Sequence, residues 1–140
     1  MKSIICYLSY SGNTEEIAEI LEKKLVENNH LVEMYAIGSG SVPDLSLYDK
    51  IFMGTFTWDM GGTPEEMEDF ISEVGCEFNN VYVFGSGDTQ FGGDELFCKA
   101  VDNVLKHYRS SYEGLKIEQS PRGSQVNLVN KWIEGVLKND

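Results

Sequence analysis

A chain of 140 residues can bury one hydrophobic core but hardly more, so we expect a single domain over residues 1–140. Its apolar fraction of 41% excludes a disordered chain, and no apolar run has the length of a membrane span. The net charge of −12 argues against nucleic acid as a partner and favours basic protein partners, or solubility alone.

The cysteines indicate a reducing compartment. There are three, at Cys6, Cys76 and Cys98, and no two form a CxxC pair. An odd, scattered set argues against a disulfide framework and against a zinc site, so no metal site is expected. The opening residues, MKSIICYLSYSGN, turn polar too soon for a secretory signal peptide. We therefore expect a cytoplasmic protein.

Apolar runs alternate with helix-patterned stretches along the chain. The predicted strands cover residues 3–9, 30–37, 50–56, 80–87 and 113–120. The predicted helices cover residues 14–29, 63–74, 94–108 and 124–137. In the second helix, Thr63 is the expected cap and Pro64 the expected first-turn residue. The intervening residues 38–49 are rich in Gly and Ser and are interpreted as a connection.

This alternation, with central strands that are apolar along their length, predicts an α/β fold whose parallel sheet is covered on both faces. Five strands suggest the doubly wound order 2-1-3-4-5. Ligands then bind outside the carboxyl ends of the strands, at the switch point between the first and third strands. The unusual stretches do follow strands 1, 3 and 4: SYSGNT (9–14), TFTWDMGG (55–62) and GSGDTQFGG (85–93).

The first of these loops has the composition of a phosphate site. Gly12 allows a tight turn into the helix, whose first free N–H groups and positive dipole end favour an anion. Ser9, Ser11 and Thr14 add hydroxyls and Asn13 an amide, whereas Lys and Arg are missing from the loop. Neither GxxxxGK[ST] nor GxGxxG is present, so a single phosphate with uncharged donors is predicted. The alternative is a plain helix cap made by Asn13 or Thr14.

Two aromatic residues stand at the tips of the other loops. Trp58 follows the third strand and Phe91 the fourth, each among glycines and small polar residues. A planar heterocycle between them would give both rings a stacking face, and ordinary packing at the sheet edge is the alternative. The two histidines, His30 and His107, are interpreted as surface residues without a functional role.

The three loops resemble those of the flavodoxins. The shared motifs are S-x-S-G-N-T-E, T-W after the third strand, and G-S-G-D-T-x-F…F-C-x-A-V-D after the fourth, and the resemblance runs from Ser3 to about Leu137. It implies a three-layer flavodoxin-like fold, non-covalently bound FMN and no catalytic residue. The implied FMN-binding residues are Ser9, Tyr10, Ser11, Gly12, Asn13, Thr14, Thr55, Phe56, Thr57, Trp58, Asp59, Met60, Gly61, Ser86, Gly87, Asp88, Thr89, Phe91 and Cys98.

The same resemblance implies a role for each group. Residues 9 and 11–14 would hold the phosphate, residues 56–59 would line one side of the isoalloxazine, and residues 86–89 and 91 the other, with Cys98 at the pyrimidine edge. Trp58 and Phe91 match the two stacking positions. The implied function is a low-potential one-electron carrier that docks transiently, at its FMN edge, on basic partners such as a flavodoxin reductase. We expect the protein to be a monomer.

Acidic residues are expected to tune the cofactor. Asp59, Asp88 and Asp94, with the phosphate, disfavour an anionic reduced flavin. One unit charge about 8 Å away contributes roughly 2 kcal/mol at an effective dielectric near 20. Asp59 stands where the family commonly has Gly, so the half-reduced flavin should be less stabilised, unless Met60–Gly61 supplies the flexible peptide.

Two other functions stay open. Phe91 replaces the family's usual Tyr, and the glycines around it resemble the flavodoxin-like activator of class Ib manganese ribonucleotide reductase. A receiver or binding domain without flavin is the other alternative. Receivers need acidic residues at the end of the first strand, where this chain has Ser9 and Tyr10.

Overall fold

The structure, a computed structural model, describes residues 1–9, 12–57, 63–75, 78–87, 99–108, 112–118 and 121–138. The strands are β1 (Lys2–Tyr7), β2 (Leu31–Ala36), β3 (Lys50–Phe56), β4 (Val81–Gly87) and β5 (Leu115–Glu118). The helices are α1 (Asn13–Glu27), α2 (Glu65–Val74), α4 (Lys99–Tyr108) and α5 (Ser124–Lys138), with a short 3-10 turn, η1 (Leu45–Leu47).

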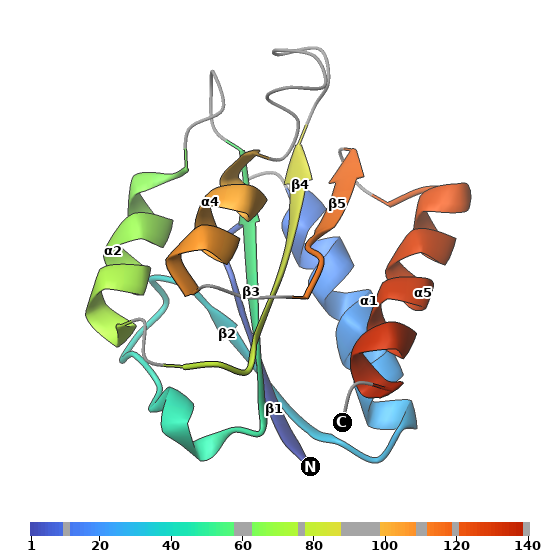
Figure 1. Ribbon diagram of the computed structural model, residues 1–140, viewed down its shortest axis with the longest axis horizontal. Coiled ribbons are helices and arrows are strands. Elements are labelled where there is room, and N and C mark those ends of the chain that lie inside the picture. The colour runs from blue at the N-terminus through green and yellow to red at the C-terminus, as the bar shows by residue number, and fades with distance from the viewer. Residues whose placement is uncertain are drawn as a thin grey trace.

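The strands form one sheet of order β2-β1-β3-β4-β5, which confirms the predicted topology. Every neighbouring pair is parallel. The register pairs Tyr7 with Gly54 and Phe56 with Ser86, so the carboxyl ends of β1, β3 and β4 reach the same edge of the sheet. That edge is the upper one in Figure 1.

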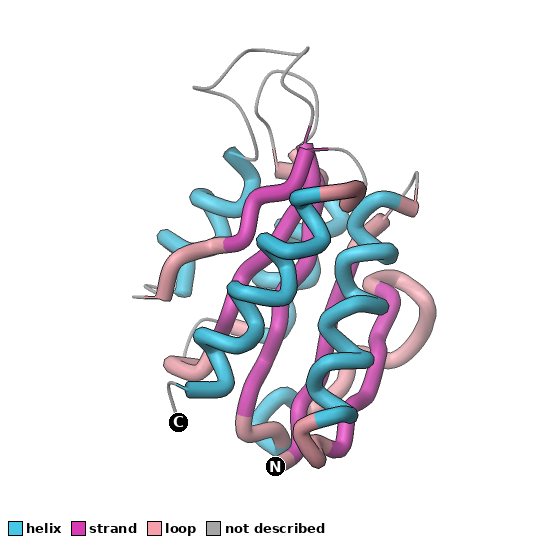
Figure 2. Tube along the Cα trace, turned by 90° about the vertical axis from the view of Figure 1, so that its right-hand side faces the viewer, coloured by secondary structure: helices cyan, strands magenta, loops and turns pink. Residues whose placement is uncertain are grey.

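Helices cover both faces of the sheet. α1 and α5 lie on one face and α2 and α4 on the other, and Figure 2 looks directly onto the α1/α5 layer. Side chains of β1, β3 and β4 are buried along their length, as their apolar runs predicted, whereas the edge strand β2 has exposed positions. The α1/α5 core contains Ile5, Ile17, Phe52, Phe84 and Ile133, and the α2/α4 core contains Met53, Met67, Val83 and Val101. None of the helices in the described ranges has both the length and the hydropathy that a bilayer crossing requires.

α1 ends two residues before the predicted end at residue 29. Asn29 has φ 66°, in the left-handed region that Asn tolerates better than most residues. The N–H of Asn29 donates to Val26 O at 3.0 Å, and the N–H of His30 donates to Leu25 O at 3.0 Å. This pair of bonds is a Schellman motif, which satisfies the last carbonyls of the helix and turns the chain toward β2.

α2 begins at Glu65, so the prediction that Thr63 caps a helix with Pro64 in its first turn was wrong. Pro64 occupies the N-cap position with extended backbone angles, φ −57° and ψ 141°. Its carbonyl accepts the first helical bonds, from Met67 N at 3.0 Å and Glu68 N at 3.1 Å. The Thr63 hydroxyl instead accepts a hydrogen bond from Asn103 of α4.

Other boundaries differ by a few residues. β1 covers Lys2–Tyr7 rather than 3–9, and β5 covers Leu115–Glu118 rather than 113–120, whereas β3 has the predicted bounds. The turn η1 lies within the predicted connection 38–49. Asp44 starts it by accepting a bond from Ser46 N at 3.0 Å. Residues 94–98 of the predicted helix 94–108 lie outside the described residues.

His30 was wrongly predicted to lie on the surface. It is only 9% exposed, and its Nδ1 lies 3.0 Å from the Ser3 hydroxyl at the amino end of β1. The Schellman turn brings it against the start of β1, a consequence of tertiary packing that its sequence neighbours do not reveal. His107, by contrast, is exposed on α4, as predicted.

Gly54 offers a direct test of the close packing in the sheet. It pairs with Phe84 across β3 and β4, and an added Cβ would overlap the Phe84 ring, with Cε2 at 2.5 Å. We expect Gly54→Ala to lower the free energy of unfolding by about 1–3 kcal/mol because the core must shift to admit the methyl group. Urea unfolding followed by circular dichroism measures this.

Gly40→Ala is the matched control for that substitution. Gly40 is exposed, and a Cβ there would meet nothing within 4 Å. It should change the free energy of unfolding by less than about 0.5 kcal/mol. Equal stability of the two variants would show that the Phe84 ring does not restrict position 54.

Candidate functional site

The connection from β1 to α1 turns at Gly12. This residue is the N-cap of α1, with φ 91° and ψ −8°, a left-handed conformation that glycine adopts without a Cβ penalty. The alternative that Asn13 or Thr14 is the N-cap was therefore wrong, since Asn13 is already the first helical residue. A Cβ on Gly12 would face open space. Because glycine has no side chain, the N-cap residue forms no side-chain hydrogen bond with the N–H groups of the first turn. Helix N–H groups left in this way suit an anion.

Ser9 shapes the start of this connection. Its hydroxyl oxygen accepts a bond from the Gly12 N–H at 3.1 Å. Because a hydroxyl can accept and donate at the same time, the Ser9 hydroxyl can still donate a hydrogen bond to a ligand. Tyr10 and Ser11, which complete the loop, lie outside the described residues.

Thr14 connects the first turn of α1 to the ends of two strands. Its hydroxyl donates to Thr55 O at 3.3 Å and lies 3.0 Å from the Ser86 hydroxyl. With the Thr14 proton directed at Thr55, Ser86 must be the donor in the second bond. All three residues are at most 3% exposed, so this hydroxyl chain is sealed from water. It joins β1–α1, β3 and β4 at the predicted binding edge.

Thr57 makes a comparable junction at the end of β3. Its N–H donates to Ser86 O of β4 at 3.2 Å, and its hydroxyl oxygen accepts the Ala100 N–H of α4 at 3.1 Å. Phe56 beside it is half-buried and packs against the α2/α4 core. The ends of β3 and β4 are thus held to each other and to α4, just before the two segments of the sequence that are predicted to line the ring.

The predicted binding residues divide into two groups. The structure brings nine to one edge of the sheet: Ser9, Gly12, Asn13, Thr14, Thr55, Phe56, Thr57, Ser86 and Gly87. The other ten lie outside the described residues: Tyr10, Ser11, Trp58, Asp59, Met60, Gly61, Asp88, Thr89, Phe91 and Cys98. The stacking of Trp58 and Phe91 and the role of Asp59 therefore stay predictions.

One charged residue near the first turn of α1 was missed by sequence reasoning. Glu15 and Glu16 lie in that turn, where negative charge competes with an anionic ligand. Arg122, before α5, donates to Glu16 Oε2 at 2.8 Å and so compensates one of the two charges. The two residues are 106 positions apart, and no local pattern connects them.

The one described cysteine has no chemical role at this edge. Cys6 lies in the interior of β1 with no exposed surface, and burial raises the pKa of its thiol to about 12. At neutral pH it is therefore a protonated, apolar packing group and neither a nucleophile nor a metal ligand.

Comparison with known proteins is consistent with this geometry. The family model described as Flavodoxin matches residues 5–110. Probable flavodoxin 1 of Bacillus subtilis is 38% identical over 145 residues, covering 97% of this chain and 90% of its own. Oxidised flavodoxin 2 from Bacillus cereus superposes with a TM-score of 0.88, at 32% identity and full coverage of both chains. Fusobacterium nucleatum flavodoxin bound to flavin mononucleotide shares the fold, with a TM-score of 0.80 at 15% identity, covering 99% of this chain and 98% of its own.

The hydroxyl chain through Thr14 predicts a stability difference. Thr14→Val keeps the side-chain shape but leaves the Ser86 hydroxyl and the Thr55 carbonyl without this partner in a buried site. We expect the apoprotein to lose about 1–3 kcal/mol of unfolding free energy, as buried polar groups left unpaired do. Thr14→Ser should recover most of it in urea denaturation. A valine variant as stable as the serine variant would refute the chain's contribution.

Proposed function

The chain belongs to the flavodoxin family, and we propose that it is a low-potential one-electron carrier that binds FMN non-covalently at the carboxyl edge of its sheet. The observation that carries this proposal is the first turn of α1. It opens at Gly12 without a side-chain cap, at the same edge as the ends of β3 and β4. This edge would supply hydrogen-bond donors to a phosphate and, from the segments after β3 and β4, the two sides of a site for a ring attached to it.

The phosphate would be held by uncharged donors. The first N–H groups of α1, the Asn13 amide and the hydroxyls of Ser9 and Ser11 supply them. The Thr14 hydroxyl donates to Thr55 O, so Thr14 would mainly hold the first turn of α1 against the sheet, beside the phosphate. Because no Lys or Arg is part of this turn, the phosphate would keep its negative charge inside the site.

The ring would lie between the segments that follow β3 and β4. Thr57 and Ser86 hold the roots of these segments, and Trp58 and Phe91 are the proposed stacking residues. FMN supplies the electron-accepting chemistry when bound, and the protein supplies binding, orientation and an electrostatic field. With its acidic residues the chain would disfavour extra negative charge on the ring, which corresponds to a low potential.

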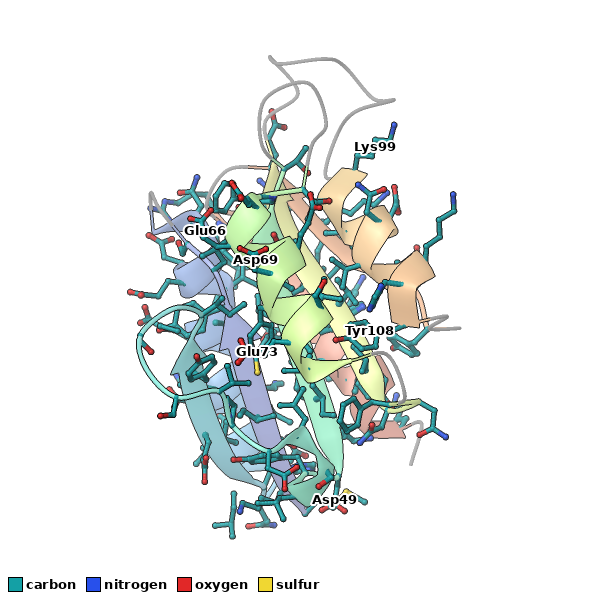
Figure 3. All side chains as sticks on the ribbon, turned by 90° about the vertical axis from the view of Figure 1, so that its left-hand side faces the viewer. Asp49, Glu66, Asp69, Glu73, Lys99 and Tyr108 are labelled. Carbon is teal, nitrogen blue, oxygen red and sulfur yellow. The ribbon has the colours of Figure 1, made fainter. Side chains whose placement is uncertain are left out.

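The charges of the chain suggest where partners dock. Residues 1–98 hold 18 of the 23 acidic residues but only four of the 11 basic ones. α2 alone has five exposed acids and no base, and Figure 3 shows Glu66, Asp69 and Glu73 along its outer face, with Lys99 on the neighbouring α4. We propose that basic redox proteins, such as a flavodoxin reductase, dock transiently at the FMN edge and approach it from the α2 side. A cytoplasmic monomer without nucleic-acid or membrane partners fits this role.

The relatives and solved neighbours above are flavodoxins, and they give the alternative function no additional support. That alternative is the flavodoxin-like activator of class Ib manganese ribonucleotide reductase. It would require a specific complex with the metal-site subunit of that enzyme.

The phosphate site predicts strong discrimination between two flavins. The purified apoprotein should bind FMN at one equivalent, turn yellow and quench the flavin fluorescence. Riboflavin, which lacks the phosphate, should bind at least about a hundredfold more weakly, because the loss of even two of these charge-assisted hydrogen bonds costs about that much affinity. Fluorescence titration measures both dissociation constants, and stepwise reduction of the FMN complex should show little half-reduced flavin. A colourless protein that ignores FMN would instead favour a binding domain without flavin.

The docking proposal predicts a charge-dependent electron-transfer rate. Replacing two acids of α2, Glu66→Gln with Asp69→Asn, should slow electron transfer from the reduced holoprotein to cytochrome c, a basic acceptor. At low ionic strength the second-order rate constant should fall roughly threefold, and its dependence on salt should weaken. Stopped-flow measurement over a salt series tests this.

Glu27→Gln with Glu113→Gln is the matched control for that double variant. It removes the same charge from exposed positions away from α2. Equal slowing by both pairs would mean that net charge alone, and not the α2 face, steers the encounter.

A further inference from the structure

Helix α4 holds both ends of the segment that carries Trp58. At the entrance, the Ala100 N–H of α4 donates to the Thr57 hydroxyl oxygen at 3.1 Å. At the exit, the Asn103 side-chain amide donates to the Thr63 hydroxyl oxygen at 2.9 Å. Only residues 58–62 separate Thr57 from Thr63 in the chain. Two bonds to one rigid element thus fix the separation and orientation of the two flanks.

The same helix follows directly from the other ring-lining segment. Residues 88–98 connect β4 to Lys99, where the described part of α4 begins. α4 is therefore connected to both segments that bear the predicted stacking residues: it is bonded to the flanks of residues 58–62 and directly follows residues 88–98. A helix is the stiff element here, packed through Ala100, Val101 and Val104 against the sheet, where all three are at most 1% exposed.

The two bonds differ in their surroundings. Thr57 also donates its N–H to Ser86 O, so the entrance bond belongs to the sheet edge itself. Asn103 is exposed, and with Thr63 it lines a groove of about 330 Å³ between α2 and α4. An exposed bond between neutral side chains adds little to global stability. Neither Asn103 nor Thr63 belongs to the predicted FMN-binding residues, so their effect on the cofactor would be indirect.

We propose that Asn103 and Thr63 are positioning residues for the flavin: their bond holds the exit of segment 58–62 on α4 and so presets the wall of the ring site. This inference rests on the proposed function for its FMN readout but not for its apoprotein readout. A binding wall that is already ordered loses less conformational entropy when the ligand binds. Releasing one flank would increase that entropy loss and so weaken binding. The bond contains no charge, so its removal leaves the field at the ring unchanged.

The test uses two single variants and their combination. Asn103→Ala removes the donor, and Thr63→Val removes the acceptor with little change in shape. Each should raise the FMN dissociation constant by about two- to tenfold, the effect of losing one hydrogen bond, and should change the visible circular dichroism of the bound flavin. The double variant should bind no more weakly than either single variant, because both remove the same interaction. Thr63→Ser, which keeps the hydroxyl, should bind like the unmodified protein.

Asn127→Ala is the matched control. Asn127 is exposed on α5, on the opposite face of the sheet, and the substitution makes the same change of residue type within a helix. It should leave both the dissociation constant and the flavin dichroism unchanged. Losses that add fully in the double variant, or that Asn127→Ala reproduces, would overturn the proposal.

Hydrogen exchange of the apoprotein provides a readout that needs no flavin. Peptides spanning residues 57–63 should exchange faster in Asn103→Ala and Thr63→Val than in Asn127→Ala. If the unmodified protein fails to bind FMN but this difference is observed, the proposed function falls and the positioning of the segment stands. If FMN binds and neither exchange nor affinity responds, the positioning role falls and the proposed function stands.

Discussion

Parallel pairing of β1 with both β2 and β3 is the constraint on which the rest of the structure depends. It sends the chain outward to β2 in one direction and to β3, β4 and β5 in the other. The connecting helices then lie on opposite faces, α1 and α5 on one and α2 and α4 on the other. Beside β1 the loops therefore diverge at the carboxyl edge, which is where open α/β sheets bind ligands. The site follows from the strand order before any side chain is considered.

Patterns that depend on burial were readable from the sequence. β3 has its predicted bounds because it is buried along nearly its whole length and is therefore mostly apolar between Lys50 and Phe56. Helix ends were less readable, since they depend on backbone angles. Asn29 ends α1 by adopting φ 66°, and Pro64 stands before α2 rather than within it. A sequence window records which residue types allow such turns but not which residue takes them.

The sequence predicted which loops form the candidate site but not which hydrogen bonds connect them. Ser9, Gly12 and Thr14 were predicted as phosphate-binding residues from their side-chain and backbone chemistry. The fold places their turn beside Thr55 and Ser86. The partners of these residues come from elsewhere in the chain: Ser86 is 72 positions from Thr14, and Arg122 is 106 from Glu16. Such pairings exist only once the sheet has formed, so no spacing rule within one segment could indicate them.

Neutral hydroxyls make several of the connections at this edge, beside the ion pair of Arg122 with Glu16. Thr14, Thr57 and Thr63 each tie a turn or segment to a neighbouring element, and each uses one oxygen that can both accept and donate. An ion pair in the same positions would lose hydration and would place two opposite fixed charges near a bound ring, and their field would change the potential of the ring as well as its position. Hydrogen bonds from neutral hydroxyls would fix the position of the ring without adding charges that change its potential. In the proposed site the threonines would set the geometry, and the field would come from the phosphate and from the predicted acidic residues.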